Sequence, residues 1–205
     1  SGQTAEAVKA FQQLVDKFPA SELGAEATYM LAQQKYETQD YAAAAETYTN
    51  VLSHTQAPEL REKTQYKLGW SLYQQQRYPQ AAKEFAEQAR EFPAGTLAVD
   101  AQFMLAECSF KQEQYEAAVP LYKQARQAIE SAGDSAASEQ VKSLVYLHGA
   151  QCYRELGQWD ECEQWLNVVI QDYPKSPNLW TAVYELGYCK QKQEQPIEAL
   201  KYYSQ

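Results

Sequence analysis

The sequence predicts an all-α protein, a solenoid of antiparallel helix pairs with about 11 helices. The first reason is composition: 16 tyrosines, abundant Ala and Gln, few Ile or Val and only eight glycines among 205 residues favour amphipathic helices over strands. The second is a segment that recurs at nearly fixed intervals, which is typical of stacked repeats. The third is a small and a large residue that recur at two fixed positions of each repeat.

The repeat is described from one reference residue, the one that opens the second helix of each pair, which we call the zero position. The zero positions are Thr4, Tyr41, Tyr78, Tyr115, Trp159 and Pro196. The successive intervals are 37, 37, 37, 44 and 37 residues. The long interval contains Ser131–Ser138, whose flexible composition predicts a loop or an extended helix end for the seven extra residues.

Two further positions predict how the helices pack. Three residues after zero the side chains are all small: Ala7, Ala44, Ala81, Ala118, Cys162 and Ala199. Seven residues after zero they are all large: Phe11, Tyr48, Phe85, Tyr122, Leu166 and Tyr203. Residues four apart share one face of a helix, so each second helix supplies both a knob and a hole to its neighbours.

A first helix in each pair is indicated by apolar or small residues ten and nine positions before zero. These are Leu31-Ala32, Leu68-Gly69, Leu105-Ala106, Gly149-Ala150 and Leu186-Gly187. Pro58 and Pro177 mark helix starts, and Gln39-Asp40, Gln76-Arg77 and Gly157-Gln158 mark the turns. The first helices are predicted at 24–38, 60–76, 97–112, 138–156 and 178–193. The second helices are predicted at 3–17, 41–54, 78–91, 115–131, 159–172 and from 196 onward.

The whole chain, 1–205, is predicted to form a single repeat array. It opens on a second helix without its first and stops within another second helix, so we expect it to be a fragment of a longer protein with uncapped apolar ends. The expected units are 1–19 (an odd second helix), 20–57, 58–94, 95–134, 135–175 and 176–205.

The small residues nine before and three after zero and the aromatic residue seven after it are joined by the closing pairs Phe18-Pro19, Phe92-Pro93 and Tyr173-Pro174. This pattern resembles the tetratricopeptide-repeat (TPR) family over the whole chain. The 37-residue period departs from the family's usual period of about 34. So do Thr28, Gln65 and Gln102, where the family usually has a large residue. The resemblance implies a right-handed superhelix whose first helices line a concave inner wall.

Ala, an aromatic residue and Leu recur fourteen, twelve and ten positions before zero. The three sets are Ala27, Tyr29, Leu31; Ala101, Phe103, Leu105; and Ala182, Tyr184, Leu186. These sets are similar to the repeats of bacterial cell-envelope proteins, including the periplasmic Tol-Pal partner and outer-membrane-assembly lipoproteins. The resemblance implies a bacterial periplasmic or outer-membrane-associated setting.

Charge and hydropathy argue against two classes of partner. The net charge of −9 repels nucleic-acid backbones and anionic lipid, and no concentrated basic patch offsets it. No run approaches the roughly 18 apolar residues of a membrane span, so direct membrane insertion by this segment is not expected. The compartment stays open.

Aromatic residues twelve, eight and five positions before zero are the candidates for binding a partner on the implied inner wall. They are Tyr29, Tyr36, Tyr66, Trp70, Tyr73, Phe103, Phe110, Tyr184 and Tyr188. These positions lie beside the core positions on the helix wheel, and half-exposed rings offer large contact areas. The alternative interpretation is that the rings fill crevices between neighbouring first helices.

The sequence predicts no catalytic residue, no cofactor and no metal. Cys108, Cys152 and Cys189 share the position seven before zero, and His148 lies one turn before Cys152. Equivalent positions on stacked helices lie about 8 to 10 Å apart, too far for a disulfide or a shared ion, so these cysteines and Cys162 are expected to be buried apolar residues. The chain contains no phosphate-binding loop and no nucleophile elbow.

These observations predict a protein-interaction scaffold, not an enzyme, that binds a protein or peptide on its concave aromatic wall. One alternative is a self-association module that forms a homo-oligomer. Another is a regulatory or targeting domain of a larger enzyme.

Overall fold

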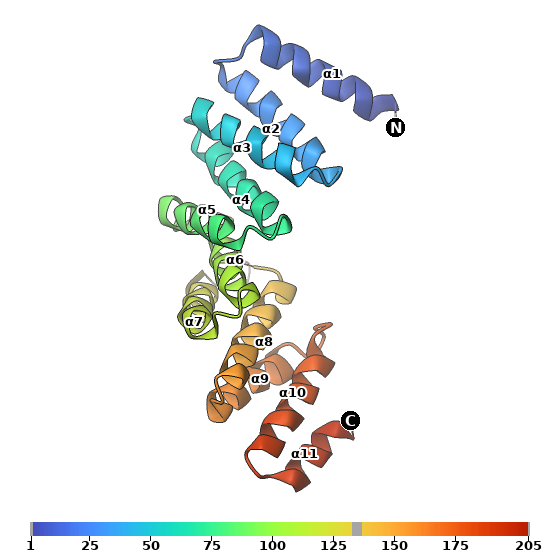
Figure 1. Ribbon diagram of the computed structural model, residues 1–205, viewed down its shortest axis with the longest axis vertical. Coiled ribbons are helices and arrows are strands. Elements are labelled where there is room, and N and C mark those ends of the chain that lie inside the picture. The colour runs from blue at the N-terminus through green and yellow to red at the C-terminus, as the bar shows by residue number, and fades with distance from the viewer. Residues whose placement is uncertain (1, 133–136, 205) are drawn as a thin grey trace. The chain divides into compact units, whose positions relative to one another are not determined.

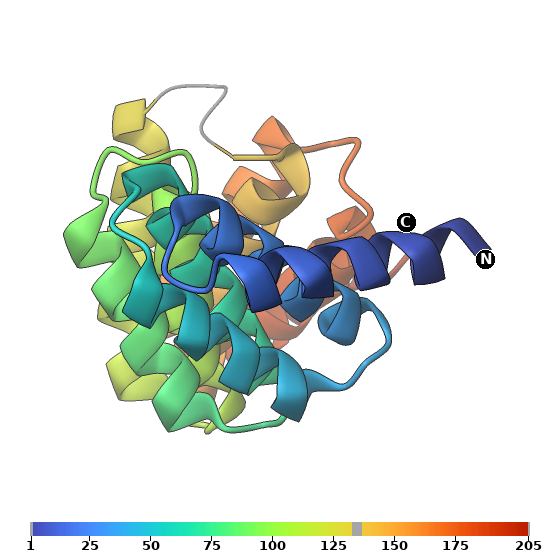
Figure 2. The same cartoon turned by 90° about the horizontal axis from the view of Figure 1, so that it is seen from above.

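The computed structural model describes residues 2–132 and 137–204, and every regular element in those ranges is an α-helix. Figures 1 and 2 show these helices joined by short loops, with no strand in the described ranges. The helices are α1 (Gly2–Lys17), α2 (Glu22–Glu37), α3 (Tyr41–His54), α4 (Pro58–Gln74), α5 (Tyr78–Glu91), α6 (Ala98–Lys111), α7 (Tyr115–Ala132), α8 (Glu139–Glu155), α9 (Trp159–Asp172), α10 (Leu179–Lys192) and α11 (Pro196–Tyr203). The predicted all-α fold of successive helix pairs is confirmed. Residues 133–136 of the predicted insertion lie outside the described ranges.

From α3 onward the second helices begin where the sequence predicts them, whereas α1 begins at Gly2, one residue earlier than predicted. The helices α3, α5, α7, α9 and α11 open on the zero positions Tyr41, Tyr78, Tyr115, Trp159 and Pro196. The first helices agree less closely, because α2 and α4 each begin two residues earlier than predicted. At the start of α2 the Ser21 hydroxyl caps the helix by accepting a hydrogen bond from the Gly24 N–H at 3.0 Å. At the start of α4 no side chain caps the helix, and Pro58 opens it as a residue that has no N–H to satisfy.

In each turn between the two helices of a pair, the residue two positions before zero has a left-handed backbone conformation. These residues are Gln39, Gln76, Glu113, Gly157 and Glu194, with φ of 64°, 59°, 58°, 69° and 61°. The next N–H then reaches back to a carbonyl five residues earlier, as from Arg77 to Leu72 at 3.0 Å. This bond satisfies a helix-end carbonyl and fixes the direction in which the second helix leaves the turn.

The chain divides into two compact bodies, residues 1–101 and 102–205, which we call the N-terminal and C-terminal bodies. In the N-terminal body each of the helices α1 to α4 packs against the next along the chain, and α4 packs against α5. The first helices α2 and α4 also contact each other. In the C-terminal body α7 packs on α8, α8 on α9, α9 on α10 and α10 on α11. Figure 1 shows consecutive helices reversing direction, for example α1 and α2.

The small and large columns form the core of the internal repeat units. Three residues after zero, exposure is at most 2% from the second unit onward, at Ala44, Ala81, Ala118, Cys162 and Ala199. Seven residues after zero, the side chains of Tyr48, Phe85, Tyr122 and Leu166 are fully buried. The first and last units differ: Ala7 is exposed, Phe11 is half-buried and Tyr203 is 40% exposed. The second helices α3 and α9 each pack against the helix before and the helix after them, which explains the burial in their units.

Polar side chains near the start of a first helix form hydrogen bonds with the loop that follows the second helix of the same pair. Glu22 accepts hydrogen bonds from the Thr55 hydroxyl at 2.6 Å and from the Gln56 N–H at 3.1 Å. Glu62 does the same for the Leu97 N–H at 3.0 Å. The Glu22 bonds thus fix the end of their own unit, whereas the Glu62 bond couples neighbouring units, the kind of interface on which the stability of repeat proteins depends.

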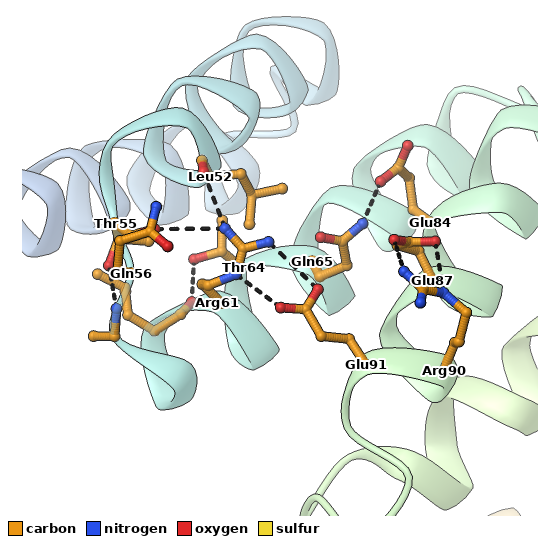
Figure 3. Close-up of polar contacts among 12 residues, drawn as sticks. Leu52, Thr55, Gln56, Arg61, Thr64, Gln65, Glu84, Glu87, Arg90 and Glu91 are labelled. Atoms are coloured by element: carbon orange, nitrogen blue, oxygen red, sulfur yellow. Dashed lines mark hydrogen bonds and ion pairs between the residues drawn. The ribbon is translucent and has the colours of Figure 1, made fainter.

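Arg61 of α4 makes a second link of this kind, and Figure 3 shows its position between α3 and α5. Its guanidinium donates to the carbonyl oxygens of Leu52 and Thr55 at 3.3 and 3.5 Å. It also donates to both carboxylate oxygens of Glu91 at 2.9 and 3.3 Å. One side chain therefore joins three consecutive helices of the N-terminal body.

Candidate functional site

The aromatic residues twelve positions before zero pack against the large residue of their own second helix. In the N-terminal body the ring centroids of Tyr29 and Tyr48 are 5.6 Å apart, and those of Tyr66 and Phe85 are 5.8 Å apart. In the C-terminal body the same relation joins Phe103 to Tyr122 at 6.5 Å and Tyr184 to Tyr203 at 5.6 Å. Each of these rings thus packs against another ring within its own unit.

The aromatic residues five positions before zero pack against the zero residue itself. The centroid distances are 5.1 Å for Tyr36 and Tyr41, 5.2 Å for Tyr73 and Tyr78, and 6.0 Å for Phe110 and Tyr115, all in edge-to-face geometry. This arrangement is the favourable one for two aromatic quadrupoles. It explains why aromatic residues recur at the zero position as well.

Three candidate residues form a continuous row on α4, which we call the α4 aromatic row: Tyr66, Trp70 and Tyr73. The Trp70 centroid lies 6.4 Å from that of Tyr66 and 5.6 Å from that of Tyr73. All three side chains are half-buried. The row therefore combines fixed ring positions with accessible area, which are the properties of residues that dominate protein interfaces.

Two lysines of α4 extend this surface to α2. The Lys63 Nζ lies 4.9 Å from the centroid of Tyr29, and the Lys67 Nζ lies 5.4 Å from that of Tyr36. Both distances are within cation–π range. The lysines cover the faces of rings whose edges already pack on α3, so Tyr29 is only 8% exposed. We did not identify Lys63 and Lys67 from the sequence, although they lie on α4 near the aromatic positions.

The phenols of Tyr29, Tyr36 and Tyr66 stay protonated at neutral pH. Burial raises the pKa of Tyr29 and Tyr36, and it raises the pKa of Tyr66 to about 12. Neutral phenols can donate and accept hydrogen bonds but do not act as nucleophiles under these conditions. The surface therefore offers a partner aromatic area, two cations and a few hydroxyl groups.

In the C-terminal body Phe103 and Phe110 belong to a largely buried cluster around His148. The His148 ring stacks on Phe110 at 5.1 Å with an interplanar angle of 3°, and its Nδ1 lies 2.6 Å from Oε1 of Glu107. The Tyr122 hydroxyl donates to the same carboxylate oxygen. Phe103 is 7% exposed, so this predicted site residue offers little area to a partner, whereas Phe110 is half-buried.

The remaining candidates, Tyr184 and Tyr188, lie on α10. Tyr188 is half-buried, packs on Trp159 at 6.2 Å and has the Lys192 Nζ 5.3 Å from its centroid. Tyr184 is 62% exposed and borders an open hollow of about 490 Å³. The hollow is lined by Trp180, Val183, Tyr184, Gln191, Tyr202 and Tyr203. Trp180, which is 64% exposed, is not among the residues predicted from the sequence, and its position in the repeat is not aromatic in the other units.

Among residues 2–132 and 137–204 no group of three or more His, Cys, Asp or Glu side chains is arranged to hold a metal ion. All four cysteines are buried thiols. Burial raises the pKa of Cys108 and Cys152 to about 12. In the same part of the chain no helix has the length and apolar character needed to cross a bilayer.

Comparison with protein families gives three overlapping matches. A family described as tetratricopeptide repeat-like domain matches residues 1–96, and two families described as tetratricopeptide repeat match residues 66–136 and 110–186. No curated protein matches the chain.

Solved structures give the same fold at low sequence identity. The apo form of RapI is similar with a TM-score of 0.84 and 15% identity; the match covers 98% of this chain and 57% of RapI. MamA from Desulfovibrio magneticus RS-1, solved from residue 41 to its end, has a TM-score of 0.71 and 15% identity, over 90% of this chain and 93% of the solved MamA chain. YrrB, described as a TPR protein with an unusual peptide-binding site, has a TM-score of 0.69 and 19% identity, over 95% of this chain and 89% of YrrB. This chain therefore spans little more than half the length of RapI.

Proposed function

The chain belongs to the tetratricopeptide-repeat family, whose models together match residues 1–186, and from this premise we propose that it is a non-catalytic protein-interaction scaffold. The proposed binding surface in the N-terminal body is the α4 aromatic row together with Tyr36, Lys63 and Lys67; the predicted residue Tyr29 lies buried beneath Lys63 and supports this surface from below. The proposed ligand is a protein segment or peptide that presents apolar or aromatic side chains.

The observation that carries this proposal is the arrangement of Trp70 between Tyr66 and Tyr73 at 6.4 and 5.6 Å. Held by its neighbours, a half-buried Trp loses little conformational freedom when a partner covers it. Solvated lysines beside the row add donors at the rim of the same surface. The description of YrrB as a peptide-binding protein supports the proposal by fold alone.

The proposal can be tested with a displayed library of random peptides selected on the wild-type chain. Binding of the selected peptides is then measured by calorimetry for wild type, Trp70→Ala and Trp180→Ala. Trp180 is the matched control, because it is an exposed Trp of the C-terminal body. We expect Trp70→Ala to weaken binding by at least about 10-fold, the effect of losing a hot-spot residue. Trp180→Ala should leave binding within about 2-fold of wild type.

Circular dichroism verifies that both variants stay folded. If the double variant Trp70→Ala, Tyr73→Ala is folded and binds the selected peptides as tightly as wild type, the α4 aromatic row is not the binding surface. The contributions predicted for Phe103, Phe110, Tyr184 and Tyr188 can be measured with the same peptides.

Self-association is a second candidate function, and exposed apolar residues of α10 and α11 favour it. Trp180, Tyr184, Ile197 and Leu200 are 64%, 62%, 76% and 65% exposed. Apolar patches of this kind often mark interaction sites. Sedimentation over a concentration range tests the idea: a dimer that Tyr184→Glu dissociates supports it, and a monomer at all concentrations rejects it.

Two finer expectations stay predictions. One is the bacterial cell-envelope setting implied by the Ala, Tyr and Leu pattern of the first helices. The other is a role as a regulatory or targeting domain of a larger enzyme.

A further inference from the structure

Two buried thiols from consecutive repeat units meet in the C-terminal body. The Sγ atoms of Cys162 in α9 and Cys189 in α10 are 2.7 Å apart, and the two residues are 1% and 0% exposed. A disulfide bond measures about 2.05 Å, so the two sulfurs are within about 0.7 Å of the bonded distance. Formation of a bond between them requires little movement of the helices.

Ion pairs and hydrogen bonds hold α9 and α10 together on both sides of these thiols. The Lys190 Nζ lies 2.6 Å from the Glu163 carboxylate, and the Gln193 amide donates to Asp160 at 2.8 Å. Each of these residues is within four positions of Cys162 or Cys189. The close approach of the sulfurs therefore belongs to a helix interface that is fixed by several contacts.

The other two cysteines provide an internal comparison. Cys108 and Cys152 are also fully buried, but the structure gives neither of them a sulfur contact within the described residues. This difference in sulfur contacts follows from the positions of the cysteines in the repeat. Cys162 lies three residues after a zero position and Cys189 lies seven before the next one, and these two positions face each other across consecutive units.

At the equivalent contacts of the other units, the position three after zero is Ala, so only one consecutive pair of units has cysteine at both positions. Comparing cysteines at the same repeat position led us to expect sulfurs a full helix spacing apart. That comparison omitted Cys162, which occupies the Ala column.

Metal binding does not explain the pair. Two thiolates bound to one zinc ion lie about 3.7 Å apart, since each Zn–S bond is about 2.3 Å and the geometry is tetrahedral. The observed 2.7 Å leaves no room for an ion between the sulfurs.

We propose that Cys162 and Cys189 form an intramolecular disulfide that covalently joins consecutive repeat units whenever the chain folds in the presence of a low-molecular-weight disulfide. The thiolate of one cysteine attacks the small disulfide, breaks its S–S bond and releases one small thiolate. The second cysteine, as thiolate, attacks the protein sulfur of this mixed disulfide and releases the second small thiolate. The protons of the two cysteines end on the two released thiols. Two cysteines are oxidised and one small disulfide is reduced.

The exchange is expected during folding rather than in the folded chain. In the fold, the hydrogen bond with Cys189 and burial raise the pKa of Cys162, which suppresses the reactive thiolate. Before α9 and α10 pack against each other during folding, both thiols are accessible to the small disulfide. After the two helices have packed together, the burial of both cysteines protects the disulfide from reductants.

The experiment is to refold the reduced, denatured full chain in a glutathione redox buffer and in dithiothreitol. Free thiols are alkylated in denaturant, and the products are analysed by intact mass and peptide mapping. We expect two alkylated thiols, Cys108 and Cys152, and a Cys162–Cys189 cross-linked peptide from the glutathione sample. The dithiothreitol sample should carry four alkylated thiols. The oxidised chain should melt about 5 to 10 °C higher, because the bond closes a loop of 27 residues.

Cys162→Ala is the matched variant, since Ala occupies this position in the other units. It should fold, as measured by circular dichroism, and should lose both the cross-link and the difference in melting temperature. Cys108→Ser, the comparison variant, should retain both. Four alkylated thiols after oxidative refolding, or a cross-link that involves Cys108 or Cys152, would refute the proposal.

Discussion

Gly69 of α4 lies directly against the ring of Phe85 of α5. A Cβ built on Gly69 would come within 2.7 Å of Phe85 Cε1, closer than two carbon atoms can approach. Phe85 is fully buried and cannot move aside. The same relation recurs in the last unit, where a Cβ on Gly187 would come within 2.6 Å of Tyr203 Cε1, but Tyr203 is 40% exposed.

These two glycines give a first prediction. Gly69→Ala should destabilise the chain by about 1 to 3 kcal/mol, because the added methyl overpacks a closed site. Gly187→Ala should be neutral or slightly stabilising, because Tyr203 can swing outward and Ala favours the helix. Thermal unfolding followed by circular dichroism measures both. Equal destabilisation by the two substitutions would show that ring freedom does not decide the outcome.

The turns give a second prediction. Gln76 and Gly157 occupy the same left-handed position in different units, with φ of 59° and 69°. Gln76→Gly should raise stability by up to about 1 kcal/mol, since a non-glycine residue pays a steric cost at positive φ. Gly157→Gln should lower it by a similar amount. The paired melting temperatures check the sign, and a loss of stability in Gln76→Gly would contradict the explanation.

A third prediction concerns the carboxylate of Glu107, which accepts from the Tyr122 hydroxyl and lies 2.6 Å from His148 Nδ1. Glu107 is 5% exposed, so Glu107→Ala removes the acceptor from two polar groups and leaves a cavity. We expect a loss of about 2 kcal/mol or more, measured by urea denaturation. The exposed Gln124→Ala on α7 is the control and should change stability by less than about 0.5 kcal/mol. If Glu107→Ala matches this control, the cluster contributes nothing to stability.

A fourth prediction concerns alkaline pH. Burial raises the pKa of Tyr66 to about 12, whereas the pKa of a tyrosine in the unfolded chain is about 10. The folded chain therefore retains a proton that the unfolded chain loses. The stability from this group is complete below about pH 10 and is lost as pH rises toward about 12. Tyr66→Phe removes this contribution, so its melting temperature should fall less steeply than that of wild type between pH 9 and about 12. Parallel curves would contradict the prediction.

The positions of the helices could be predicted because they depend on local and periodic information. A small residue three after zero and a large one seven after it place one face of each second helix in the core. Tyr41 and Tyr78 therefore open helices where expected. The starts of the first helices differ more from the prediction, because caps such as Ser21 extend α2 beyond the periodic pattern.

The candidate site could be predicted only in part. Periodicity identified Tyr29 and Tyr184 as equivalent, yet they are 8% and 62% exposed. Lys63 of the next first helix lies over the Tyr29 ring, whereas the described chain has no first helix after α11 to do the same for Tyr184.

The sequence alone determined that the chain is a series of helix pairs, which residues open the second helices from α3 onward and which columns are apolar. Only the tertiary structure decided which aromatic rings are covered and that Cys162 meets Cys189. The physical reason is that a repeat period describes one helix relative to its own axis. Burial and contact depend on the side chains that the neighbouring helix presents, and these differ from unit to unit.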